Sequence, residues 1–497
     1  MAKRAKPLLV GLLLGSVLLV SWPRALSSLG PFPYYRLWLE VSFGIGGADP
    51  EFTGHEQLEY VNTEGQALEE LYLRLYPNGG LTYGSGSLTI TAAKVNGTMT
   101  ELAIEANGTA VRVPLEKPLL PGESLVLELA FTGRVPQGFA SSNGSSYGIY
   151  DYSGGMLKLA NWFPILAAYD EAGWHLDPFY NWGDAVYSET ANFEVWITAP
   201  AEQVVVASGT ELEQIANPDG TVTHHYTAEL MRDFFVAMSP YLARLTAQVG
   251  STRVNSYYFA GDELGGQKAL EVGANALALF NERFGLYPFP ELDLLETSLP
   301  WAGGVEYPGV VLISDKLYGS AEYMAKQELQ FAMIVSHEVA HQWWYSLVGN
   351  DVIREPWLDE ALATYSSGIY AQEFLGPRAY QDLLSDWEAN WRRARAQVEA
   401  PITAPLDRFY NNSIYYGIVY CGGALFYDEL RAYLGDGPFF AGLQEYFRRF
   451  EYQVAKTNEL LATFEEVSGR ELDELYNRWL FTPATSPSLV GEGLIGR

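Results

Sequence analysis

The second half of this 497-residue chain contains the stretch Ser336-His-Glu-Val-Ala-His341. Glu360 follows it in Trp357-Leu-Asp-Glu-Ala361. Two histidines four residues apart lie on the same face of a helix, one turn apart. At that spacing both imidazoles can reach one metal ion at about 2.0–2.1 Å, and a carboxylate from a following helix can be the third ligand. Two histidines, one carboxylate and an open fourth position are typical of catalytic zinc. We therefore predict one Zn²⁺ per chain, bound by His337, His341 and Glu360.

Glu338 follows the first histidine and points to the side of the metal, where it can take a proton from metal-activated water. The pattern His-Glu-x-x-His also occurs by chance on polar helices. Here, however, the flanking stretches Phe331-Ala-Met-Ile-Val335 and Trp343-Trp344 are strongly apolar, which predicts a buried helix. Unpaired buried charge is costly, so such a helix rarely carries two histidines and a glutamate without partners. The surroundings favour a metal site over a chance match.

The composition is that of a globular protein. Apolar residues make up 48% and charged residues 18% of the chain, and 497 residues exceed one ordinary domain, so we expect two large domains. The net charge of −29, from 31 Lys+Arg against 60 Asp+Glu, argues against nucleic acid and anionic membrane surfaces as partners. The single cysteine, Cys421, excludes an intramolecular disulfide and a cysteine-based zinc site.

The N-terminus has the pattern of an export signal. Three basic residues among the first six precede the apolar run Leu8–Val20, and Ala25-Leu-Ser27 offers a small-residue cleavage site. We therefore expect residues 1–30 to be a signal peptide or an uncleaved signal-anchor. The protein would then be extracytoplasmic, either secreted or tethered to a membrane by this segment.

Alternating apolar residues predict an all-β domain at residues 35–245. Strand patterns lie between Gly, Pro and Asn turn signals, and no long helical period interrupts them. The clearest strand patterns are Tyr72–Tyr76, Leu88–Thr91, Val111–Val113, Leu125–Leu129 and Phe193–Thr198.

From about residue 250 the apolar period becomes helical. Strand patterns at Leu292–Glu296 and Val310–Ile313 flank a loop that contains Gly303 and Gly304. The predicted helices are Gln267–Phe284, Ala325–Leu347, Trp357–Phe374, Tyr380–Gln397, Gly417–Leu434, Phe439–Phe450 and Asn458–Leu480. A small sheet before a helix-rich lobe predicts an α+β multidomain protein, with a catalytic domain at residues 250–485 and a tail at residues 486–497.

Two segments carry a resemblance to a known family. Gly303-Gly-Val-Glu-Tyr-Pro-Gly309 and His337-Glu-Val-Ala-His-Gln-Trp343, the latter followed by Glu360, resemble the aminopeptidase N and leukotriene-hydrolase family of gluzincin zinc metallopeptidases. That family's signature is a Gly-x-Met-Glu-Asn loop before a gluzincin zinc motif. Val419-Tyr-Cys-Gly-Gly-Ala424 is similar to the family's Tyr-x-Lys-Gly-Ala segment, and Leu58–Asn78 resembles its N-terminal strands.

The resemblance implies a thermolysin-like, helix-rich zinc catalytic domain behind the β-domain. It implies zinc-binding roles for His337, His341 and Glu360, a general base at Glu338, an amine-binding carboxylate at Glu306 and a catalytic hydroxyl at Tyr420. Gly303 and Gly304 would let the backbone approach the substrate closely. The chain departs from the family pattern at Val305, Tyr307 and Gly422, where relatives usually have Met, Asn and Lys.

Two of these roles have ordinary structural alternatives. Glu306 can be an exposed loop charge, and Tyr420 can be a core residue in a chain with 33 tyrosines. A second acidic or amide anchor for the substrate amine is not identifiable in the β-domain, including near Gly154-Gly155.

These observations predict a zinc-dependent aminopeptidase that removes N-terminal residues from peptides with a free N-terminus. An exported zinc endopeptidase with the same chemistry is the first alternative, and loss of the amine anchor would point to it. A catalytically silent peptide-binding module is disfavoured, because the ligands and Glu338 are all present. A membrane-anchored partner of a transporter is suggested only by the N-terminal apolar run.

Overall fold

The computed structural model describes residues 31–43, 49–80, 82–141 and 144–483. The described residues from 32 onward cluster as one compact unit. The predicted export segment, residues 1–30, and the predicted tail, residues 486–497, lie outside the described residues. Across the described ranges, no helix combines the length and the apolar character needed to cross a membrane.

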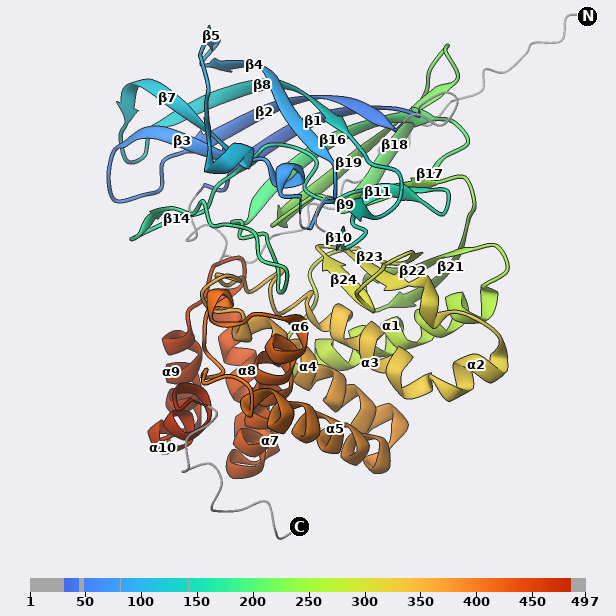
Figure 1. The fold of residues 1–497 in the computed structure, drawn as a ribbon, viewed down its shortest axis with the longest axis vertical. Coiled ribbons are helices and arrows are strands. Elements are labelled where there is room, and N and C mark those ends of the chain that lie inside the picture. Colours follow the sequence, from blue (N-terminus) through green and yellow to red (C-terminus); the bar gives the residue numbers. More distant parts are fainter. Residues whose placement is uncertain (1–30, 44–48, 81, 142–143, 484–497) are drawn as a thin grey trace, which may run out of the picture. The chain divides into compact units, whose positions relative to one another are not determined.

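Strands make up most of the structure up to residue 239, where the sequence predicts them (Figure 1). The largest sheet has eight strands in the order β18-β19-β16-β1-β2-β8-β4-β5. β1 (Tyr34–Ser42) runs parallel to β16 (Ala191–Pro200), and the other neighbours pair antiparallel. The other strands are β2 (Glu51–Val61), β4 (Ser87–Val95), β5 (Thr98–Met99), β8 (Ser124–Arg134), β18 (Thr210–Ala216) and β19 (Thr221–Met231). Buried residues alternate along β1 and β2, so one face of the sheet packs on the core.

Two four-stranded sheets complete this half, in the orders β13-β3-β7-β6 and β11-β12-β20-β17. The first contains β3 (Leu68–Arg74), β6 (Ala103–Glu105), β7 (Ala110–Leu119) and β13 (Ile165–Leu166). The second contains β11 (Tyr150–Ser153), β12 (Met156–Leu159), β17 (Val204–Ala207) and β20 (Val236–Ser239). Two short hairpins are β9 (Ala140–Ser141) with β10 (Gly144–Ser145), and β14 (Tyr169–Asp170) with β15 (Gly173–Trp174). Fully buried Trp162 packs edge-on against Phe52 and Phe163 at the centre of the core.

A five-stranded sheet opens the second half, in the order β21-β22-β23-β25-β24. Its strands are β21 (Leu242–Val249), β22 (Thr252–Phe259), β23 (Glu291–Thr297), β24 (Gly304–Tyr307) and β25 (Val310–Ser314). The predicted boundary at residues 245–250 falls inside the β21–β22 hairpin, so the change of sheet comes earlier, between β20 and β21. The predicted Gly-rich loop is also shorter, because Gly304 already begins the edge strand β24.

Helices fill the rest of the second half, as predicted (Figure 1). They are α1 (Glu263–Arg283), α2 (Ala321–Lys326), α3 (Glu328–Ala340), α4 (Trp357–Tyr370), α5 (Pro377–Arg395), α6 (Asn412–Tyr415), α7 (Gly422–Leu434), α8 (Asp436–Phe450), α9 (Thr457–Ser468) and α10 (Asp473–Tyr476). Three π-helical turns extend them: η5 (Ala371–Leu375), η7 (Tyr416–Cys421) and η8 (Asn477–Phe481). A strand-rich first half followed by a mixed, helix-rich second half is the predicted fold class.

Two predicted helices are shorter in the structure. The helix predicted at Ala325–Leu347 is divided into α2 and α3, and α3 ends at Ala340, after which the backbone turns and the Ser346 N–H bonds to the His341 carbonyl at 3.0 Å. The helix predicted at Asn458–Leu480 breaks at Gly469, whose φ of +63° caps α9 in the left-handed conformation that favours glycine.

Buried Arg232 joins the two halves of the described chain. Arg232 directly follows β19, and its guanidinium donates to the carbonyl of Ser188 in the strand-rich half at 3.1 Å. It also donates to the carbonyls of Tyr345 at 2.8 Å and Gln453 at 2.6 Å in the helical half. These hydrogen bonds satisfy a cation that is only 2% exposed, and they connect both halves to the segment that follows α3.

Candidate metal and active site

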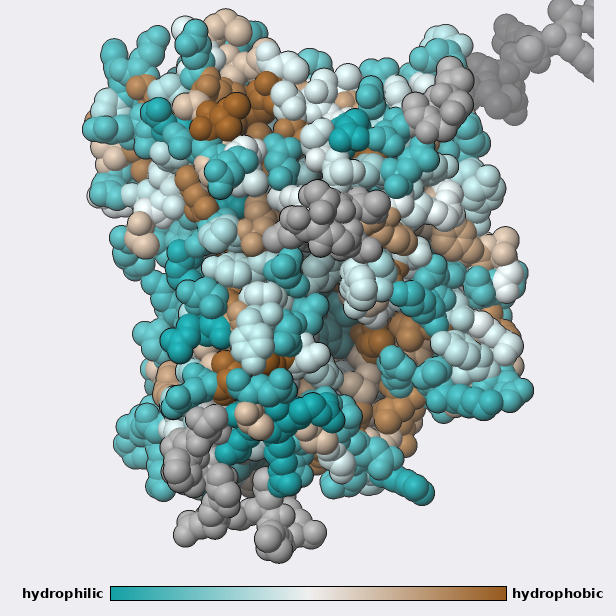
Figure 2. Space-filling model, in the orientation of Figure 1, coloured by the Kyte–Doolittle hydropathy of each residue, from teal (hydrophilic) through white to brown (hydrophobic). Residues whose placement is uncertain are grey.

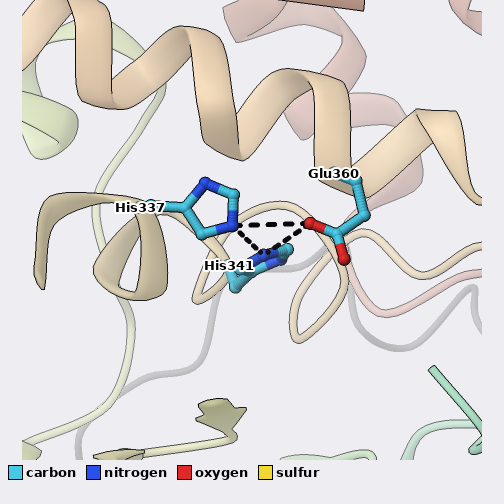
Figure 3. A group of neighbouring side chains, drawn as sticks. All are labelled: His337, His341 and Glu360. Atoms are coloured by element: carbon cyan, nitrogen blue, oxygen red, sulfur yellow. Dashed lines mark hydrogen bonds and ion pairs between the residues drawn. The ribbon is translucent and has the colours of Figure 1, made fainter. Parts of the chain in front are cut away.

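His337 and His341 lie one turn apart at the C-terminal end of α3, as their spacing predicts (Figure 3). Their Nε2 atoms are 3.1 Å apart and point to the same place. The other ring nitrogens face away from that place. The Nδ1 of His341 donates to the Trp344 carbonyl at 3.0 Å, and the Nδ1 of His337 lies 3.5 Å from the Thr364 hydroxyl. These contacts orient both rings and leave each Nε2 free to bind a metal.

Glu360 lies in the first turn of α4, which packs against α3, and completes the group that Figure 3 shows. Its Oε2 is 3.4 Å from the Nε2 of His337 and 3.4 Å from the Nε2 of His341. This oxygen is buried and has no hydrogen-bond partner in the described structure. Ligand bonds of 2.0–2.1 Å at tetrahedral angles place neighbouring donor atoms about 3.3 Å apart. The three donor atoms therefore have the spacing and the chemistry that one zinc ion requires.

The charges in this group suit metal binding. Burial would raise the pKa of Glu360, but its contacts with His337 and His341 lower that pKa to about 2, so the carboxylate is ionised at neutral pH. Burial lowers the pKa of His337, which favours the neutral imidazole. Burial also opposes the charged form of His341, yet Glu306 and then Glu360 raise its pKa well above the usual value. A metal that binds His341 consequently displaces a proton.

Glu338 and Glu306 also lie beside His341. One carboxylate oxygen of each residue and one ring nitrogen of His341 lie within 4.8 Å of one another. Burial and then the Glu306 charge raise the pKa of Glu338 well above its usual value. A buried carboxyl group beside the metal position is placed to exchange a proton there.

Gly303 and Gly304 allow β24 to lie against α3. A Cβ atom on Gly304 would lie 2.4 Å from the Cγ of Glu338, and one on Gly303 would lie 2.5 Å from the Cδ1 of Ile334. The close approach that the sequence predicts is therefore an approach to helix α3. Contact of these two glycines with a substrate stays a prediction.

Glu306 lies on the edge strand β24, where it is half-buried and lines a cavity, rather than on an exposed loop. Tyr420 lies on the π-helical turn η7, and its hydroxyl donates to the Oε1 of Glu360. The Tyr420 ring also stacks on the ring of His337, with centroids 5.8 Å apart. The structure thus brings all the predicted polar side chains together. Glu306 is not an exposed loop charge, and the catalytic role of Tyr420 stays a prediction.

Gly422 occupies the place where the family usually has a lysine. A Cβ atom at this position would lie 2.8 Å from the Cδ1 of Trp391, so the indole ring excludes a longer side chain. This position of α7 therefore brings no cation to the site.

A cavity of about 450 Å³ contains these groups and is lined from both halves of the described chain. In the view of Figure 2, the surface is hollowed near the position that β24 and α6 occupy in Figure 1. Asp184, from the loop before β16, also lines the cavity, and its burial and the Glu306 charge raise its pKa well above the usual value. Sequence reasoning missed Asp184, because a single aspartate in a loop more than a hundred residues before the zinc motif carries no local signal.

Comparison with known proteins identifies a family domain and several relatives. Residues 268–479 match the peptidase family M1 domain. Aminopeptidase M1-A from Oryza sativa subsp. japonica is 28% identical over 298 residues, which are 58% of this chain and 34% of the relative. Aminopeptidase N from Streptomyces lividans is 30% identical over 230 residues, which are 44% of this chain and 26% of the relative. The matches thus span about a third or less of the length of these relatives.

Solved structures share the fold over nearly the whole chain. The M1 zinc metallopeptidase from Deinococcus radiodurans has a TM-score of 0.67 at 23% identity, and the likeness covers 94% of this chain and 96% of that chain. A variant of it bound to a Tyr-Ser-Ala substrate has a TM-score of 0.64 at 22% identity, with 90% and 93% coverage. The structural likeness confirms the predicted fold class, and the family match confirms the predicted resemblance.

Proposed function

With residues 268–479 forming a peptidase family M1 domain, we propose that this chain is a zinc aminopeptidase that hydrolyses the first peptide bond of peptides with a free N-terminus. The observation that carries the proposal is that two further carboxyl groups lie beside the donor triangle, which consists of His337 Nε2, His341 Nε2 and Glu360 Oε2. Glu306 and Glu338 lie beside His341, which also belongs to the triangle with His337 and Glu360. One group of side chains can thus hold the metal, a proton-transfer group and a partner for a cationic amine.

His337, His341 and Glu360 would hold one zinc ion per chain, which agrees with the predicted cofactor. When bound, zinc supplies a Lewis acid that lowers the pKa of a water ligand toward about 7 and polarises a carbonyl group. Both imidazoles are held by contacts on their Nδ1 side, and Glu360 is held by Tyr420 through its second oxygen. The protein thereby fixes the three donor atoms before the metal binds.

The other side chains perform the proton and charge chemistry. Glu338 accepts the proton that the attacking water loses and returns it to the nitrogen of the leaving amine. Glu306 pairs with the substrate's α-ammonium group, which places the first peptide bond next to the metal position. The Tyr420 hydroxyl, which donates a hydrogen bond to Glu360, can turn toward the substrate's carbonyl oxygen as negative charge develops on that oxygen.

A zinc endopeptidase with the same chemistry remains the second candidate, and a silent peptide-binding module the third. The position of Glu306 supports the aminopeptidase, because a half-buried carboxylate beside the metal site suits a cationic amine better than an internal amide. The curated relatives are named aminopeptidases, and they support the same choice. The intact set of donors with Glu338 argues against a silent module.

We expect unblocked peptides to lose single N-terminal residues and N-acetylated versions of the same peptides to react roughly ten- to hundredfold more slowly in kcat/KM. Acetylation removes a charge that otherwise pairs with Glu306, and a hydrogen bond to a charged group contributes about 1.5–3 kcal/mol. Mass spectrometry of the products from both substrates measures this difference. Glu306→Gln, which keeps the shape of the side chain, should narrow the difference by slowing the free peptide. Internal cuts as the main products, or equal rates on both substrates, would establish the endopeptidase instead.

We also propose that the protein acts outside the cytoplasm. The basic residues before Leu8–Val20 and the small residues at Ala25-Leu-Ser27 support export, and an uncleaved segment would tether the protein to a membrane. Cell fractionation combined with intact-mass measurement tests this proposal. A shortened product outside the cytoplasm is expected from a cleaved signal, whereas a full-length membrane-bound product would identify a signal-anchor. A full-length soluble product in the cytoplasm would refute export.

A further inference from the structure

The loop that carries Asp184 is attached to the helical half on both sides of that residue. The Trp182 indole donates to the Leu406 carbonyl at 2.9 Å, and the Tyr345 hydroxyl donates to the Val186 carbonyl at 2.9 Å. Gly183 adopts φ +69°, and a Cβ atom there would lie 2.6 Å from the Cδ2 of Leu406. A larger residue at position 183 would meet both a left-handed backbone and a packed neighbour. The backbone of residue 184 is therefore held in one place at the cavity wall.

Asp184 and Asp233 are the carboxylates of the described cavity lining that the proposed chemistry does not use, and they differ in their partners. Five carboxyl groups belong to the described lining: Asp184, Asp233, Glu306, Glu338 and Glu360. Asp233 accepts hydrogen bonds from the Asn161 side chain and from the Phe234 N–H, and the three glutamates have proposed roles. Asp184 forms no hydrogen bond or ion pair with any part of the chain that the structure describes, and the described lining contains no lysine or arginine.

Two tyrosines accompany Asp184 in the cavity wall. Tyr147 and Tyr415 both belong to the described lining of the cavity that contains Asp184. The Tyr415 hydroxyl would lie 3.2 Å from a Cβ atom on Gly183, directly before Asp184. A half-buried carboxylate beside aromatic rings is the arrangement that binds guanidinium and ammonium groups in proteins, through ion pairing and cation–π contact.

We propose that Asp184, with Tyr147 and Tyr415, binds the cationic side chain of an N-terminal arginine or lysine. This inference rests on the proposed aminopeptidase function and adds its substrate class. Glu306 receives the α-ammonium group, and Asp184 receives the second positive charge that only basic residues bring. Asp184 and Glu306 line the same cavity, so a substrate whose α-ammonium group pairs with Glu306 can present its side chain to Asp184.

Pairs of substrates that differ only in the side-chain charge test the proposal. Arg-Ala is compared with citrulline-Ala and Lys-Ala with norleucine-Ala, and kcat/KM is measured for all four. The wild-type protein should prefer each basic substrate over its neutral counterpart by roughly ten- to hundredfold, the range for a hydrogen bond to a charged group. Asp184→Asn should reduce both preferences at least about tenfold, because asparagine keeps the size of the side chain and removes its charge.

Glu202→Gln is the matched control, since Glu202 is an exposed acid outside the cavity lining and its loss changes the net charge equally. It should leave both preferences unchanged. Equal kcat/KM values of the wild type on basic and neutral partners would overturn the inference. So would an equal loss on all four substrates in Asp184→Asn, because that result would assign Asp184 to the α-ammonium group common to them. Hydrolysis of the neutral dipeptides without a basic preference would leave the aminopeptidase function standing, whereas hydrolysis of none would refute that function first.

Discussion

We expect Glu338→Gln to bind zinc as the wild type does and to lose on the order of 10²–10⁴ in kcat. Glu338 lies beside the donor triangle and does not belong to it, so the metal site should survive the substitution. Glutamine has nearly the same shape and fits the narrow space against Gly304, where even a Cβ atom would lie 2.4 Å from the Glu338 Cγ. It cannot accept a proton, however, so the attack of water loses its base.

His337→Ala is the complementary variant. Replacing His337 removes one of the three donor atoms, so metal analysis should find that His337→Ala has lost most of its zinc. Glu338→Gln should keep the zinc content of the wild type. Wild-type turnover in the glutamine variant would show that Glu338 is not the base. Full zinc content in the alanine variant would show that the metal is bound elsewhere.

For Tyr420→Phe we expect kcat to fall on the order of 10²–10³ with little change in KM and full retention of zinc. One hydroxyl donor to a developing oxyanion typically contributes this much to the rate, and it acts in the transition state rather than in substrate binding. The hydroxyl donates to Glu360 in the structure, which suggests a second role in holding a metal ligand. Zinc content therefore has to be measured with the kinetics.

Tyr427→Phe provides the control for this experiment. Tyr427 is a fully buried tyrosine on the neighbouring helix α7, and its hydroxyl has no hydrogen-bond partner within the described structure. Removing that hydroxyl should leave kcat and zinc content unchanged. If Tyr420→Phe instead lost zinc in proportion to its activity, Tyr420 would be a positioning residue for Glu360. An unchanged kcat with full zinc would leave Tyr420 a packing residue.

The sequence alone predicted the features that depend on short-range geometry. The i, i+4 spacing of His337 and His341 puts both rings on one helical face wherever α3 lies, because the helix repeats every 3.6 residues. Buried and exposed residues alternate along β1 and β2, and the apolar residues change to a helical period after residue 250. Both patterns likewise reflect local burial. The break at Gly469 and the end of α3 were missed, because an apolar period alone does not mark where a helix ends.

Only the tertiary structure decided how distant segments complete the site. It showed that Tyr420 reaches Glu360, that Gly304 makes room for Glu338, and that Asp184 from the strand-rich half lines the same cavity. These residues are separated by tens to hundreds of positions in the sequence. Their proximity therefore depends on how sheets and helices pack and on hydrogen bonds between the two halves, such as those of Arg232. Packing of that kind is set by many contacts at once, whereas a motif within one helix is set by the backbone hydrogen bonds of that helix.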